Sequence, residues 1–251
     1  NASSAGDSIF VKAGTYYPNS YPPYTAAPTL TNRDFTFFIK DGVKVYGGFA
    51  GTETSFSARN VTANVTILSG DIGVAGTATD NCLHVVMSSA PSSGGIGVTI
   101  DGFTITNGHN ENTFANGGGS LTVNGNAIAR AHGVGITLTN GTNTIVNNII
   151  FNNATTHSGQ GAGLYADGGS NTIQNNKINA NSTNAYGGGI YAVNGTHNIS
   201  YNEIYNDSAL SGGYGGGMYL GNGTYNVSYN SIHDNKSNST AVAGGGIYMS
   251  N

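Results

Sequence analysis

Residues 187–207 read GGGIYAVNGTHNISYNEIYND, and residues 215–235 read GGGMYLGNGTYNVSYNSIHDN. The two stretches share their glycine clusters, their apolar positions and most of their asparagines. Weaker copies begin at Gly133 and Gly161, and a last copy begins at Gly244. Successive copies therefore start 28, 26, 28 and 29 residues apart. A repeat of this period marks a solenoid, in which each repeat is one structural unit.

Each repeat contains three short runs in which apolar and polar residues alternate, separated by glycine or asparagine. Such short runs with a period of two are typical of strands. Each strand would pair with its copy one turn later, so equal positions would stack about 4.8 Å apart. The sequence therefore predicts an all-β parallel β-helix with three strands in each coil of 26–29 residues.

Equal positions of the repeats form columns. Two aliphatic columns are predicted to fill the interior, which no repeat could bury alone. Their members are Ile136, Leu164, Ile190, Met218 and Ile247, and Leu138, Ala166, Ala192, Leu220 and Met249. Asparagine tolerates the left-handed turn conformation, and its amide can bond to the amide of the next coil. A structural ladder is therefore predicted at Asn148, Asn176, Asn202 and Asn230.

The repeat weakens towards the N-terminus. Residues 1–80 are predicted to form an N-terminal cap and irregular first coils, and residues 81–251 the regular coils of one continuous domain. Strands are expected at Ser8–Lys12, Phe35–Lys40, Val43–Tyr46, Thr66–Ser69 and Leu83–Met87. Because the sequence stops at Asn251 after the first strand of a coil, we expect a truncated end. Exposed strand edges recruit further strands, so the expected partners are further coils of the same chain or a head-to-tail homo-oligomer, a filament.

Composition excludes several classes of protein. Charged residues make up 8% of the chain and the net charge is −4, so a basic surface for nucleic acid is not expected. No apolar run approaches the about 20 residues that a membrane-spanning helix needs. The single cysteine, Cys82, lies in an apolar run and is predicted to be a buried, inert thiol.

The repeats resemble a known family. Gly-Gly-Gly-Ile-Tyr followed by Ile-x-x-Asn resembles the polymorphic outer-membrane-protein repeats of secreted bacterial surface proteins. Asp7–Tyr16, Val45–Phe49, Leu68–Ile72 and Ile100–Ile105 are similar to other parts of such proteins. The resemblance implies a right-handed parallel β-helix of the pectate-lyase-like fold and an extracellular or cell-surface location. It says little of activity, because a fold does not determine a function.

Catalysis on this fold needs a set of acids and bases, which the sequence does not show. Glycoside hydrolysis uses two carboxylates roughly 5 to 9 Å apart. Asp207 and Asp234 lie near the same turn of neighbouring coils. We interpret them as solvated turn residues, with an acid/base pair or metal site as the alternative. The six histidines, His84, His109, His132, His157, His197 and His233, have no metal-ligand spacing. We therefore predict no catalytic residues, no metal site and no cofactor.

Two outward columns are candidates for ligand contact. One contains Tyr165, Tyr191, Tyr219 and Tyr248; exposed tyrosines could stack on sugar rings, although they could equally stabilise the sheet as same-face pairs. The other is a grid of Thr142, Ser170, Thr196 and Thr224 beside Thr144, Thr172, Asn198 and Asn226. Regular hydroxyl grids can order water, so ice binding is a minor alternative.

Asn-x-Ser/Thr sequons are frequent and mark N-glycosylation acceptors if the chain is secreted by a glycosylating cell. Besides Asn1, they lie at Asn60, Asn64, Asn140, Asn153, Asn181, Asn194, Asn198, Asn206, Asn222, Asn226, Asn235 and Asn238. The sequence as a whole favours a non-catalytic extracellular β-helix, an adhesin or structural part of a surface protein or fibre that could bind glycans. The alternative is a polysaccharide lyase or glycoside hydrolase of the pectate-lyase-like class.

Overall fold

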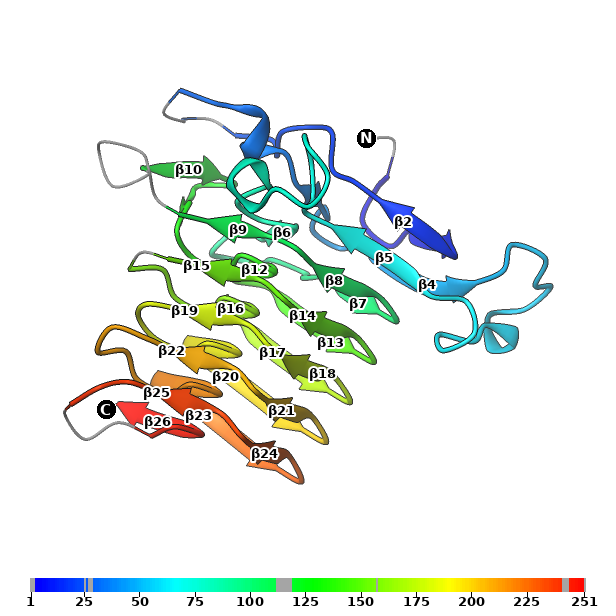
Figure 1. Ribbon diagram of the computed structural model, residues 1–251. Coiled ribbons are helices and arrows are strands. Elements are labelled where there is room, and N and C mark those ends of the chain that lie inside the picture. Colours follow the sequence, from blue (N-terminus) through cyan, green and yellow to red (C-terminus); the bar gives the residue numbers. More distant parts are fainter. Residues whose placement is uncertain are drawn as a thin grey trace.

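The computed structural model describes residues 3–24, 26, 29–111, 119–156, 158–240 and 244–250. The chain winds into a stack of coils that runs from the N-terminal end to the C-terminal end (Figure 1). Equivalent strands of successive coils pair in parallel, which builds long sheets along the axis of the stack. The predicted parallel β-helix is confirmed.

The central coils contain four strands each. One coil consists of β12 (Ile136–Thr139), β13 (Thr142–Val146), β14 (Ile149–Phe151) and β15 (Ala154–Thr155). The next consists of β16 (Leu164–Asp167), β17 (Ser170–Gln174), β18 (Lys177–Asn179) and β19 (Ser182–Thr183). The sequence predicts the first three strands. The fourth has only two residues, too few to show an alternating pattern.

In the later coils the first two strands merge into one. In one coil the merged strand is β20 (Ile190–Ser200), and β21 (Glu203–Tyr205) and β22 (Ser208–Ala209) follow it. In the next coil the merged strand is β23 (Met218–Ser228), and β24 (Ser231–His233) and β25 (Lys236–Ser237) follow it. A last strand, β26 (Ile247–Ser250), pairs with β23. The corner glycines of the earlier coils, Gly141 and Gly169, have φ of 77° and 69° and turn the chain.

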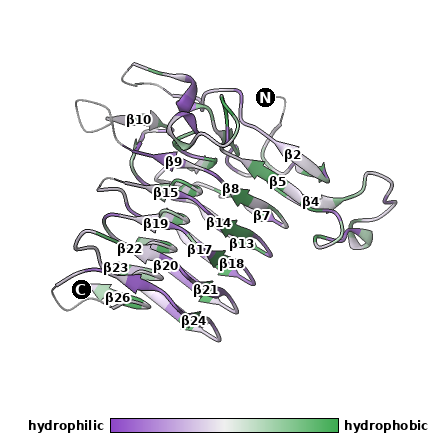
Figure 2. Ribbon diagram, in the orientation of Figure 1, coloured by the Kyte–Doolittle hydropathy of each residue, from purple (hydrophilic) through white to green (hydrophobic). Residues whose placement is uncertain are grey.

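The strand register places the predicted aliphatic columns inside the coils. Ile136 pairs with Leu164, Leu164 with Ile190, Ile190 with Met218 and Met218 with Ile247. All members of this column except Ile247 are fully buried. The third strands add a further column of buried isoleucines, Ile105, Ile150, Ile178 and Ile204. Figure 2 shows how hydrophobic and hydrophilic residues alternate along these strands.

The N-terminal third belongs to the same sheets. The first coil contains β1 (Ser8–Lys12) and β2 (Gly14–Tyr16). The second contains β3 (Phe37–Phe38), β4 (Lys44–Phe49) and β5 (Thr66–Ser69). The third contains β6 (Val86–Ser89), β7 (Thr99–Asp101), β8 (Thr104–Thr106) and β9 (His109–Asn110). Three short 3-10 helices lie between them: η1 (Asn32–Asp34), η2 (Phe56–Ala58) and η3 (Ala78–Asp80). Because β3, β4 and β5 pair with β6, β7 and β8, residues before and after position 80 form continuous sheets.

A β-hairpin forms a second core outside the coils, and the sequence pattern did not predict it. Its strands are β10 (Ser120–Val123) and β11 (Asn126–Ala129). Leu121, Val123 and Ile128 pack against Met87, and the partly buried Leu30 and Phe38 close this cluster. The expected strand at 83–87 begins later, at Val86, although Cys82 is buried as predicted. Burial raises the pKa of the Cys82 thiol to about 12, which keeps it protonated and unreactive.

The last described coils expose apolar side chains that are buried elsewhere in the same columns. Met249 is 61% exposed and Ile247 38%, whereas their column partners Leu220 and Met218 are 1% and 0% exposed. No helix among the described residues has the length and apolar character needed to cross a membrane.

Candidate binding surface and ladders

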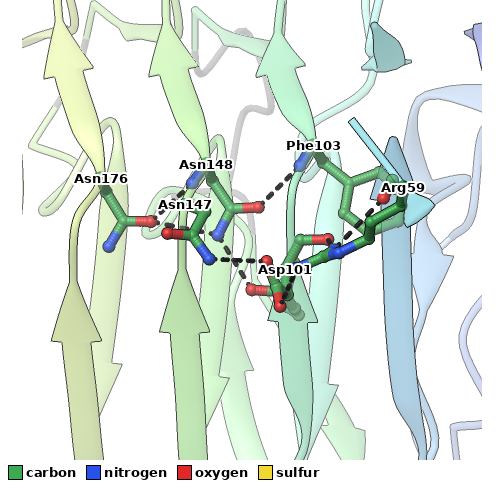
Figure 3. Close-up of polar contacts among 8 residues, drawn as sticks. Arg59, Asp101, Phe103, Asn147, Asn148 and Asn176 are labelled. Atoms are coloured by element: carbon green, nitrogen blue, oxygen red, sulfur yellow. Dashed lines mark hydrogen bonds and ion pairs between the residues drawn. The ribbon is translucent and has the colours of Figure 1, made fainter. Parts of the chain in front are cut away.

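The predicted asparagine ladder forms at the turn between the second and third strands. The Asn148 Nδ2 donates to Asn176 Oδ1 (3.1 Å), the Asn176 Nδ2 to Asn202 Oδ1 (3.0 Å), and the Asn202 Nδ2 to Asn230 Oδ1 (2.9 Å). Each Nδ2 also donates to an isoleucine carbonyl of the preceding coil: Ile100, Ile145, Ile173 and Ile199. At the N-terminal end the Phe103 backbone N–H donates to Asn148 Oδ1 (2.9 Å), as Figure 3 shows.

A second ladder lies at the turn after the third strand. It consists of Asn153, Asn181, Asp207 and Asn235, and the first three are fully buried. The Asn153 Nδ2 donates to Asn181 Oδ1 (3.1 Å), and the Asn181 Nδ2 to Asp207 Oδ1 (3.0 Å). The signal was present in the sequence, since each member lies five residues after a member of the first ladder.

This second ladder corrects the interpretation of Asp207 as a solvated turn residue. Asp207 is 0% exposed, and burial raises the pKa of its carboxyl to about 8. Its Oδ2 is buried and has no hydrogen-bond partner among the described residues. By contrast, Asp234 is exposed and hydrogen-bonds to His233 (2.8 Å). The two carboxylates therefore lie in different environments, one inside the coil and one in solvent.

The second ladder also explains the glycine clusters. The first glycine has a left-handed φ in four of the five clusters: 63° at Gly133, 62° at Gly161, 64° at Gly187 and 65° at Gly215. The third glycine lies against the ladder, where a Cβ on Gly189 would come within 2.6 Å of Asp207 Oδ2. On Gly163 it would come within 2.9 Å of Asn181 Nδ2. A side chain at the third position would therefore displace the ladder.

Two of the predicted N-glycosylation sites are fully buried in this ladder. Asn153 and Asn181 are 0% exposed, and their amides bond to the neighbouring coils, so the folded chain cannot present them. The exposed sequon asparagines are Asn60, Asn194, Asn206, Asn222, Asn226 and Asn238; Asn64, Asn140, Asn198 and Asn235 are half-buried. Asn1 and His157 lie outside the described residues.

The predicted tyrosine column is a continuous stack of rings. The centroids of Tyr165 and Tyr191 are 5.3 Å apart, those of Tyr191 and Tyr219 4.9 Å, and those of Tyr219 and Tyr248 5.5 Å. The interplanar angles are 1°, 9° and 22°. All four tyrosines are half-buried, and burial raises the pKa of Tyr191 to about 12. Since neighbouring rings cover one another's faces, this geometry favours the structural interpretation of the column.

Polar residues that could act in catalysis are held in other stacked columns. His197 lies between Asn171 and Tyr225: its Nδ1 is 3.2 Å from Asn171 Nδ2, and its ring stacks on Tyr225 at 5.2 Å. Burial lowers the pKa of His197, against the opposing effect of its hydrogen bond with the Val193 carbonyl. Among the described residues, no group of three or more His, Cys, Asp or Glu side chains could hold a metal ion.

A groove lies beside the first ladder, where the loop between β4 and β5 approaches the coil corner. Arg59 of this loop donates to Asp101 Oδ2 (2.6 Å), and its guanidinium lies 4.6 Å from the Phe56 ring centroid. Asp101 also accepts a hydrogen bond from the Asn147 Nδ2 (2.9 Å; Figure 3). The loop is thus fixed against the corner, and it encloses a groove of about 420 Å³.

Comparison with known proteins supports the fold. The model of a family described as "Right handed beta helix region" matches residues 9–200 and 81–251, nearly the whole chain. No curated protein and no solved structure matches the chain.

Proposed function

Because the chain belongs to the right-handed β-helix family, we propose that it is a non-catalytic extracellular β-helix, an adhesive or structural part of a cell-surface protein or fibre that binds glycans. The stacked side-chain columns carry this proposal. Asp207 is part of a buried amide ladder, His197 is part of a ring column, and Asp101 is held by Arg59. These acid and base groups serve cohesion between coils.

The surface composition supports glycan binding rather than binding of charged polymers. Few charged side chains interrupt the outward columns of amides, hydroxyls and tyrosines. Such groups match the hydroxyls and apolar ring faces of sugars. The resemblance to repeats of secreted bacterial surface proteins supports the extracellular location.

The proposal includes a partner at the C-terminal end of the stack. Exposed Ile247 and Met249 lie at the end of columns that are otherwise buried. A further coil or a second copy packed there would bury them, and a repeated head-to-tail contact would give a filament. Sedimentation velocity over a hundredfold range of concentration tests self-association: growing species support it, and a constant monomer contradicts it.

The test of the function combines a glycan array with a degradation assay on uronic-acid and neutral polysaccharides. We expect retention of glycans on the array and no release of reducing ends or unsaturated products. Chain cleavage that is abolished by Asp207→Asn or Asp234→Asn would instead show a carbohydrate-active enzyme of the pectate-lyase-like class. Binding to none of the glycans would refute the adhesive part of the proposal.

A further inference from the structure

The corner between the second and third strands contains an unusual substitution. Its column consists of Gly102, Asn147, Asn175, Tyr201 and Tyr229, and all five have left-handed backbones, with φ of 83°, 56°, 54°, 58° and 56°. Glycine and asparagine adopt this conformation readily, whereas it is unfavourable for a bulky aromatic residue. Two successive coils therefore place tyrosine where the backbone favours asparagine.

These two tyrosines, the corner tyrosines, contribute little to the core. Tyr201 is 54% exposed and Tyr229 is 77% exposed. Their rings are stacked with centroids 5.0 Å apart and an interplanar angle of 12°. They differ from the half-buried tyrosine column of Tyr191 and Tyr219, because each residue is more than half exposed although the two rings cover one face of each other. Strained backbone at exposed aromatic residues points to binding rather than to folding.

The corner tyrosines continue the groove beside the first ladder. The groove is lined by Asn147, Ile149, Asn175 and Lys177 of the coils, and by Val61, Thr62 and Val65 of the loop. Asn147 and Asn175 belong to the same column as the corner tyrosines. At about 4.8 Å per coil, the column from Asn147 to Tyr229 extends over roughly 14 Å. The turns of this column follow one edge of the stack in Figure 1.

The charges along this surface are mutually compensated. Lys177 lies 3.3 Å from Glu203, and its ammonium is 5.1 Å above the Tyr205 ring. Glu203 is also 3.7 Å from His233, whose ring stacks on Tyr205 at 5.2 Å. The exposed uncharged polar groups of the groove are Asn147, Asn175 and Thr62. Ile149 and Val65 add exposed apolar surface, 42% and 44%. An uncharged ligand with hydroxyls and apolar faces fits this surface.

We propose that the groove and the corner tyrosines form an elongated binding site for a neutral oligosaccharide. The amides of Asn147 and Asn175 hydrogen-bond its hydroxyls, and the rings of Tyr201 and Tyr229 contact the apolar faces of its sugar units. This inference rests on the proposed glycan-binding function and assigns it to one corner of the coil, away from the half-buried tyrosine column.

The test uses the double variant Tyr201→Asn/Tyr229→Asn, which restores the residue that the neighbouring coils carry at the same backbone position. The probes are neutral and acidic hexasaccharides immobilised on an array, with the best neutral one also measured by calorimetry. We expect wild-type binding to neutral members and at least tenfold weaker binding by the double variant. Its melting temperature should stay equal or rise, because asparagine relieves the backbone strain. The matched control is Tyr191→Thr, since Thr137 occupies that column in an earlier coil, and it should keep its affinity.

Three outcomes would overturn the assignment. If the double variant binds like the wild type while Tyr191→Thr loses affinity, glycans bind at the half-buried column: the proposed function stands and this site does not. If only acidic hexasaccharides bind, the pairing of charges on this surface does not favour uncharged ligands, and the proposed site for a neutral oligosaccharide is wrong. If no hexasaccharide binds the wild type, both the site and the glycan-binding part of the function fail.

Discussion

Replacing Asp207 by asparagine should stabilise this protein, and the effect should depend on pH. In the neighbouring coil the Asn181 Nδ2 donates both to the next ladder oxygen and to the Ile150 carbonyl (3.0 Å). Asp207 occupies the same place but has no amide hydrogens, so its Oδ2 has no partner among the described residues. Only a proton on this oxygen could make an equivalent donor.

The magnitude follows from the two pKa values of this carboxyl. Burial raises its pKa from 3.8 to about 8 in the folded chain. The folded state therefore binds the proton more tightly than the unfolded state, and stability falls as pH rises from about 4 to about 8 and is flat above. Between the unfolded pKa and pH 7 lie roughly three pH units. At 1.36 kcal/mol per unit, the buried carboxyl therefore lowers the free energy of unfolding of the wild type by about 4 kcal/mol at pH 7.

The variant Asp207→Asn removes this cost and restores the missing donor. Denaturant unfolding of both proteins between pH 4 and pH 9 measures the difference. We expect a gain of about 4 kcal/mol at pH 7, which shrinks towards zero at pH 4, where the protonated carboxyl of the wild type supplies an equivalent donor. The matched control is Asp234→Asn, an exposed acid of the next coil, which should change stability by less than about 0.5 kcal/mol. A gain that is independent of pH, or a carboxyl that titrates near 4 by NMR, would refute the reasoning.

Three further predictions concern the ladders and the sequons. Asn202→Leu removes the hydrogen bonds that Asn202 makes with the Ile173 carbonyl and with the Asn176 Nδ2 and should cost about 1–3 kcal/mol; an unchanged melting temperature would contradict the ladder. Gly163→Ala should also destabilise the protein by about 1–3 kcal/mol through overpacking. The control is Gly246→Ala at the same column position, where an added Cβ would have its nearest neighbour at 3.4 Å; this variant should be close to neutral in thermal unfolding. In a glycosylating host, mass spectrometry should find glycans at the exposed Asn194 and none at the buried Asn181; a glycan at Asn181 in folded protein would contradict its burial.

Much of the fold could be predicted because the same pattern of strands and turns recurs in each copy of the repeat. Identical positions such as Asn176 and Asn202, or Leu164 and Ile190, can stack only if each coil adds the same rise along one axis. The register of the strands confirms these columns. The two-residue fourth strands and the β10–β11 hairpin were missed, because the former are too short for a pattern and the latter occurs once.

The candidate site was harder to predict, because it depends on which side chains the folded coil leaves exposed to solvent. The sequence singled out Tyr191 and Tyr219 from their column, but only the structure shows that neighbouring rings cover them. Tyr201 and Tyr229 follow a strand and precede the ladder, and their sequence positions say nothing of exposure. Their left-handed backbone and exposed rings become evident only when the coil corner is seen as a whole.

The sequence by itself determined the parallel β-helix, its interior columns and its first amide ladder, since a period of 26–29 residues leaves one way to align equal side chains. Only the tertiary structure decided the environment of individual polar groups. Asp207 and Asp234 are similar in sequence context, yet one is enclosed between coils and the other lies in solvent. The physical reason is the turn after the third strand: Asp234 has a left-handed backbone, φ 54°, and the residue after such a turn points into the coil. Asp207 lies at the ladder position of its coil and is buried, whereas Asp234 lies one residue before that position in the next coil and is exposed.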